Sequence, residues 1–164
     1  MSQPHRSADA ELLEIIDIPD WDGPLPTGDA LAREYFAACA EGRLLLQECP
    51  RCGHRQHYPR ALCTRCAATP RWLQARGGGE IYSFSVVRQM GTRPFSRNAP
   101  YVLALVDLDE GPRLLGTVLE CELDEVEIGR RVHAVIHRIA PDLGIPQWRM
   151  DPPATPEPAG DPAT

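Results

Sequence analysis

The chain has 164 residues, enough for one ordinary domain or two very small ones. Hydrophobic residues make up 43% and charged residues 24%, which is close to the globular average and excludes wholesale disorder. No apolar run approaches the length of a membrane-spanning helix, and the acidic N-terminus does not resemble a secretory signal. We therefore expect a cytoplasmic protein with no membrane association.

The basic residues are all arginine, because the sequence contains no lysine. This excludes Schiff-base catalysis and a phosphate-loop lysine. Charge is unevenly distributed: residues 1–42 are strongly acidic, whereas residues 43–76 carry seven arginines and the single acid Glu48. One basic segment in a chain of net charge −6 suggests a local contact with an anion and argues against general affinity for nucleic acid.

The two ends of the chain have compositions typical of irregular structure. Residues 1–26 are predicted to form an acidic, flexible arm with Trp21 as a possible anchor, and the proline-rich residues 151–164 a disordered tail. Between them, residues 27–46 are predicted to hold an N-terminal helix, since Leu31, Tyr35 and Cys39 recur at about one-turn spacing. Within this segment, the helix is expected to end at Gly42.

The second half of the chain reads as short strands. Val, Ile, Leu and Tyr are frequent at 76–89, 101–111, 113–121 and 130–140, and turn residues separate these segments. Residues 77–150 are therefore predicted to form a small β-barrel or sandwich, so that the fold class is mainly β. The glycines at 77–79 are expected to form a flexible joint before it, and residues 91–100 a long loop.

Four cysteines give the strongest chemical signal. Residues 47–76 contain two C-x-x-C pairs, which is the spacing of a zinc ribbon with four thiolate ligands. A site with four thiolates is closed, so the expected role of Zn²⁺ is structural. Two alternatives to zinc remain. Two disulfides conflict with a cytoplasmic location, and the other alternative is a redox-active iron bound by the same cysteines. The predicted ligands are Cys49, Cys52, Cys63 and Cys66.

Other histidines and cysteines have simpler interpretations. His54 and His57 are possible substitute ligands but are expected to be exposed loop residues. His133 and His137 fall on one face of a predicted strand. They could bind a metal as a pair, but the preferred interpretation is that both face solvent. Cys39 and Cys121 are interpreted as buried thiols rather than nucleophiles. No catalytic residue is predicted, because no motif pairs a nucleophile with a base.

The arginines of the ribbon have three interpretations: a solvated surface, a nucleic-acid patch, or a contact with a phosphate-bearing ligand or an acidic partner subunit. Aromatic candidates for stacking on bases are few, namely Tyr82, Phe84 and Tyr101. The predicted ligand or partner contacts are Arg51, Arg55, Arg60, Arg65, Arg93, Phe95 and Tyr101.

The order of these parts resembles a known family. The segment AEGRLLLQEC, a C-x-x-C-G knuckle, a YPR stretch and a second C-x-x-C precede GGGEIYSFSVV, PYVLALVDLDEG and EIGRRV. Over roughly residues 28–150, this arrangement is similar to acyl-CoA-associated proteins that join a rubredoxin-like zinc ribbon to an OB-fold. By family position, the four cysteines above are the zinc ligands and residues 77–150 the OB-fold.

The resemblance implies a non-catalytic accessory subunit. Its expected partner is a thiolase-like or aldolase subunit, in a heterotetramer, with a hotdog-fold hydratase as a further possibility and steroid side-chain breakdown as a candidate process. The chain would dock on that enzyme and help to enclose an acyl-CoA thioester, whose phosphates suit arginine forks. The alternative from another class is a single-stranded nucleic-acid-binding protein.

Overall fold

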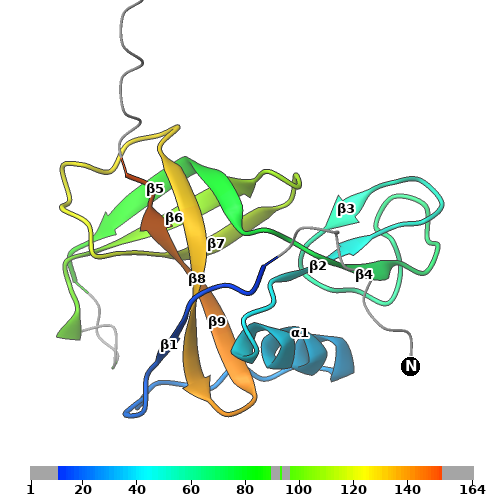
Figure 1. Ribbon diagram of the computed structural model, residues 1–164, viewed down its shortest axis with the longest axis horizontal. Helices are drawn as coiled ribbons and strands as arrows, with labels where there is room; N and C mark the ends of the chain where they lie inside the picture. The colour runs from blue at the N-terminus through cyan, green and yellow to red at the C-terminus, as the bar shows by residue number, and fades with distance from the viewer. Residues whose placement is uncertain (1–10, 90–92, 94–96, 153–164) are drawn as a thin grey trace, which may run out of the picture.

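The computed structural model describes residues 11–89, 93 and 97–152 (Figure 1). In this part of the chain, a β-barrel lies beside a smaller zinc-ribbon-like sheet, and a helix packs near both (Figure 1). No helix among these residues has the length and hydropathy needed to cross a membrane. Residues 1–10 of the predicted arm and 153–164 of the predicted tail lie outside the described residues, as does Phe95.

The barrel follows OB-fold topology. Its strands pair in the order β5-β6-β7-β9, and β8 pairs with both β9 and β5, which closes the sheet. The mainly β class and the OB-fold are thus confirmed. The strands are β5 (Gly78–Val87), β6 (Tyr101–Leu108), β7 (Arg113–Leu119), β8 (Arg131–Ala140) and β9 (Leu143–Met150).

Strict alternation of buried and partly buried residues along β6 explains why the barrel forms. Every second residue of β6, from Val102 to Leu108, is buried, and the residues between them face outward. The fully buried Trp148 fills the interior, and an added Cβ at Gly116 would lie only 2.7 Å from its indole nitrogen. The indole ring of Trp148 therefore requires a glycine at position 116.

Strand β9 was not among the predicted segments. Gly144 and Pro146 interrupt its hydrophobic pattern, and both residue types are depleted in strands. Gly144 is needed because helix α1 lies against it: a Cβ there would come within 2.5 Å of the Cys39 carbonyl carbon. The glycine that this packing requires interrupts the alternating pattern by which the strand could have been predicted.

Helix α1 spans Ala30–Ala40 and lies within the segment 27–46 that was predicted to hold it. Asp29 caps its start by accepting a hydrogen bond from the Ala32 N–H at 2.9 Å. Gly42 ends it in a left-handed conformation with φ of +80°. The leucines that follow do not extend the helix but lead into the first strand of the ribbon.

The ribbon is a three-stranded antiparallel sheet in the order β3-β2-β4, formed by Leu45–Glu48 (β2), Arg55–Gln56 (β3) and Arg71–Gln74 (β4). Strand β2 pairs with both neighbours and places Leu46 opposite Leu73. Leu44, Leu45 and Leu46 are almost completely buried, which joins the ribbon to the common core.

The predicted flexible arm contains a strand. Ile15–Asp17 (β1) pairs in parallel with β8, and the Arg138 guanidinium donates to both carboxylate oxygens of Asp17 at 2.6 and 2.8 Å. Upstream, the Leu13 N–H donates to the Gly42 carbonyl at 2.8 Å. The acidic composition of this segment predicts a flexible arm. In the structure, Ile15 and Ile16 instead pair with β8 and add a strand at the edge of the sheet.

The glycines at 77–79 do not form a flexible joint. Gly78 and Gly79 belong to β5, where a Cβ would lie 2.7 Å from an Asp109 carboxylate oxygen and 2.6 Å from the Asp107 carbonyl, respectively. Gly77 has φ of +88°, and the Leu13 side chain occupies the place of its missing Cβ. Close approach, not freedom of movement, requires these glycines.

Candidate metal centre and its surroundings

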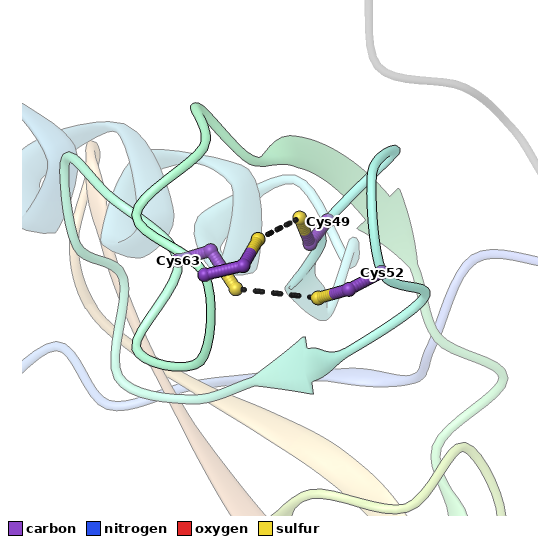
Figure 2. A group of neighbouring side chains, drawn as sticks. Cys49, Cys52 and Cys63 are labelled. Carbon is purple, nitrogen blue, oxygen red and sulfur yellow. Dashed lines mark hydrogen bonds between the residues drawn. The ribbon is translucent and has the colours of Figure 1, made fainter.

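Four cysteine sulfurs converge between the two knuckles of the ribbon (Figure 2). They lie within 4.8 Å of one another, with Sγ–Sγ distances of 3.4 Å for Cys49 and Cys66 and 3.8 Å for Cys52 and Cys63. Among the cysteine, histidine and acidic side chains of the described residues, these four cysteines form the group close enough to hold a metal ion.

Backbone N–H groups and neighbouring sulfurs act on these thiols in opposite directions. Burial raises the pKa of Cys49, but N–H groups of Cys52 and Arg51 outweigh it and lower that pKa to about 6. The His54 N–H lowers the pKa of Cys52, whereas burial and the adjoining sulfurs dominate and raise it to about 12. Four thiolates this close repel one another, so the fully ionised cluster needs a cation at its centre.

The donor set fits Zn²⁺. Four ligands at Zn–S distances near 2.3 Å imply sulfurs separated by about 3.8 Å, which agrees with the spacing here. The Gly53 N–H donates to the Cys49 carbonyl at 2.9 Å and the Ala67 N–H to that of Cys63 at 3.0 Å, so each knuckle closes a tight turn. Gly53 and Ala67 both have positive φ, which such turns require. Zn²⁺ held by four thiolates has no open position for a substrate.

Two buried glutamines hold the loop between the knuckles. Gln47 and Gln56 face each other across β2 and β3, are 4% and 6% exposed, and are joined by a hydrogen bond of 2.8 Å. Their side chains also bind the loop backbone: Gln47 accepts from the Arg60 N–H, and Gln56 accepts from the Thr64 N–H and donates to the Leu62 carbonyl. These glutamines were not predicted, because their burial depends on pairing across the strands.

The histidines of the ribbon differ from the prediction. His57 was expected to be exposed, but it packs against Tyr35 of helix α1, with ring centroids 5.1 Å apart. Burial lowers the pKa of His57 to about 4, so the ring is neutral at physiological pH. His54 is partly buried and lies 3.1 Å from the Thr64 hydroxyl. Neither belongs to the sulfur cluster.

The remaining thiols and histidines form no second centre among the described residues. Cys39 is fully buried in α1, and burial raises its pKa to about 12, so it is inert as a nucleophile. Cys121 is partly buried, and burial raises its pKa as well. His133 lies 2.6 Å from an Asp151 carboxylate oxygen, and burial lowers the pKa of the partly buried His137. The two strand histidines are therefore not fully solvent-facing.

The predicted arginine contacts occupy different environments. Arg55 is engaged, since it donates to Glu48 and to the Glu110 carbonyl of the barrel. By contrast, Arg51, Arg60 and Arg65 are exposed, and their guanidinium groups make no hydrogen bond or ion pair with any described residue. Arg93 is exposed, with its neighbours in the predicted loop outside the described residues, and Tyr101 begins β6 in the barrel. The structure does not gather all these residues into one site.

The outer face of β6, β7 and β9 is apolar and partly covered. Leu103, Leu115 and Ile145 point outward there and, with Pro24 and Leu25 of the N-terminal segment, line a hollow of about 370 Å³. An ion pair of 2.8 Å between Asp22 and Arg97 ties that segment to the loop before β6. In nucleic-acid-binding OB-folds, the face of the second and third strands holds the ligand.

Comparison with protein families gives two matches in chain order. Residues 36–70 match the model described as "ChsH2, rubredoxin-like zinc ribbon domain", and residues 72–137 match "ChsH2, C-terminal OB-fold domain". The boundary between the two matches falls at the start of β4, the last strand of the ribbon sheet.

Individual proteins agree with these matches. A "DUF35 domain-containing scaffold protein" of Methanocaldococcus jannaschii is 34% identical over 96 residues, which are 57% of this chain and 67% of the relative. A "probable enoyl-CoA hydratase alpha subunit" of Thermomonospora curvata is 34% identical over 125 residues, 75% of this chain but 37% of that subunit. The solved "Ltp2-ChsH2(DUF35) aldolase" contains a chain with a TM-score of 0.68 and 31% identity; the match covers 76% of this chain and 98% of that one.

Proposed function

Because this chain belongs to the DUF35 family, in which a ChsH2-type zinc ribbon is joined to an OB-fold, we propose that it is the accessory subunit of an acyl-CoA-converting enzyme. The observation that carries the proposal is the match over 98% of a chain from the Ltp2-ChsH2(DUF35) aldolase. The scaffold and hydratase-subunit relatives support the same role.

In this proposal, Cys49, Cys52, Cys63 and Cys66 bind one structural zinc ion. Zinc bound there would neutralise part of the thiolate charge and fix the two knuckles relative to each other. The chain's own residues supply the rest of the rigidity, through the glutamine pair and the contact of His57 with Tyr35. The ribbon is then a stable platform rather than a reaction centre.

The partner in this proposal is an aldolase or thiolase-like subunit, which supplies the catalytic groups. A heterotetramer and a steroid side-chain acyl-CoA are the specific assembly and substrate that we infer from the family resemblance, with a hotdog-fold hydratase as a second associated enzyme. The free guanidinium groups of the ribbon suit the phosphates of CoA or the acids of the partner.

Binding of single-stranded nucleic acid is the rival function. The hollow on the outer face of β6 and β7 is lined by leucines, by Pro24 and Leu25, and by a single aromatic residue, Trp21, so it offers neither repeated aromatic platforms nor a basic groove. The net charge of −6 also opposes attraction to a polyanion. Both features favour the accessory-subunit role.

A tagged copy expressed in the native host tests the proposal. We expect a stoichiometric aldolase or thiolase-like subunit to co-purify, identified by mass spectrometry, and acyl-CoA conversion to follow the complex through size exclusion. Recovery of nuclease-sensitive nucleic acid, or of the chain alone, would contradict the proposal. Binding of an oligonucleotide at two salt concentrations gives the independent control.

A further inference from the structure

We propose that residues 57–65 of the ribbon, which form the loop between the two knuckles and the start of the second knuckle, are the docking surface for an acidic protein partner that has an apolar pocket. This deepens the proposed function, on which it rests, by naming the part of this chain that meets the enzyme subunit. The loop combines exposed apolar side chains, unpaired positive charge and a rigid backbone.

Two large apolar side chains of the loop are left uncovered. Tyr58 is 63% exposed and Leu62 is 53% exposed, although they lie only four residues apart. Large apolar patches are uncommon on the surface of monomeric proteins and mark interaction sites, and these two side chains supply apolar surface to such a site. Tyrosine is also among the residues most enriched where interface energy concentrates.

The charge of the loop is unbalanced. The sequence from 49 to 79 contains no acidic residue, and the guanidinium groups of Arg60 and Arg65 have no partner within the described part of the chain. On the barrel, by contrast, Arg113 and Arg131 are each paired with an aspartate at 2.6–2.7 Å. Cations that the chain itself leaves unpaired are complementary to carboxylates on a partner.

The loop backbone is held in place before any partner arrives. Gln47 and Gln56 bind it at Arg60, Leu62 and Thr64 through hydrogen bonds of 2.8, 3.3 and 2.9 Å. The buried glutamine pair thereby fixes the backbone of Leu62, whose side chain is exposed to solvent. A preorganised surface loses less entropy on binding, which strengthens association.

These features select a protein over a polyanion. The four arginines and one exposed tyrosine of residues 49–66 do not form the repeated aromatic platforms that bases need. An apolar pocket ringed by carboxylates would instead bury Tyr58 and Leu62 while it pairs the arginines. Self-association and nucleic-acid binding are outcomes that the test separates.

Photo-crosslinking in the native host tests the docking surface. The photoreactive residue p-benzoylphenylalanine is placed at Leu62 in one full-length variant and at Ile128, which is 69% exposed on the barrel, in the matched control. Charge and shape are tested with Leu62→Asp and Arg60→Glu. The matched controls are Ile128→Asp and Arg88→Glu, since Arg88 is exposed directly after β5 of the barrel. Zinc content is measured for every variant, so that a misfolded ribbon is recognised.

We expect crosslinks from position 62 to an acid-rich peptide of the co-purified enzyme subunit and none from position 128. Leu62→Asp and Arg60→Glu, with zinc retained, should weaken recovery of that subunit at least tenfold, and the controls should not. If the complex forms but position 62 gives no crosslink, or crosslinks a second copy of this chain, the docking surface is refuted while the proposed function stands. If no acyl-CoA enzyme is recovered with the wild type, or position 62 crosslinks nucleic acid, the proposed function itself fails.

Discussion

The partly buried His57 ring makes the stability of this protein depend on pH. Its pKa falls to about 4, against an ordinary value of 6.5, because burial beside Tyr35 removes the ring from water and leaves its Nδ1 atom without a partner among the described residues. The folded state therefore resists protonation that the unfolded chain accepts. Stability from this ring is present above the unfolded pKa and is lost as the pH falls toward the folded pKa.

The size of the effect follows from the two pKa values. Between about pH 7.5 and about pH 5, proton uptake by the unfolded chain should lower the free energy of unfolding by about 2 kcal/mol. The full loss, reached below the folded pKa, is about 3 kcal/mol. This is a large share of the stability of a small domain.

Urea denaturation at the two pH values, on the wild type and on His57→Phe, measures this contribution. The variant keeps a ring against Tyr35 but cannot be protonated, so loss of zinc at low pH affects both proteins and cancels in the difference. We expect the wild type to lose about 2 kcal/mol more than the variant on acidification. Equal losses for the two proteins would show that the ring is not buried against the helix as described.

Three further outcomes follow from the packing and the sulfur cluster. Gly144→Ala should destabilise the fold by at least about 2 kcal/mol in thermal denaturation, because its Cβ meets the backbone of α1; an unchanged melting temperature would contradict that contact. Cys63→Ser should abolish stoichiometric zinc binding measured by atomic absorption, and full zinc content would exclude Cys63 as a ligand. Leu13→Ala removes the side chain that packs at Gly77, so it should speed hydrogen exchange of the N–H at position 13, which donates to the Gly42 carbonyl, while the barrel strands stay protected. Uniform exchange rates would refute a local role.

Local patterns made part of this fold predictable. The spacing of the cysteines is short, and the alternation along β6 is strict, so both features are legible without knowledge of the tertiary structure. The OB-fold itself came from a family resemblance and not from the strand pattern. Sequence reasoning failed where the cause lies elsewhere in the chain: Gly144 is set by α1, and the burial of His57 by Tyr35. Gln47 and Gln56 carry no signal, because a buried amide is satisfied only by the strand beside it.

The central claim is that this chain supports the activity of another subunit. The most direct test is the turnover of acyl-CoA by the co-purified partner, expressed with this chain, without it, and with the Cys63→Ser variant. We expect turnover to require the zinc-loaded chain and to fall at least tenfold without it or with the variant. Full turnover by the partner alone would contradict an accessory role.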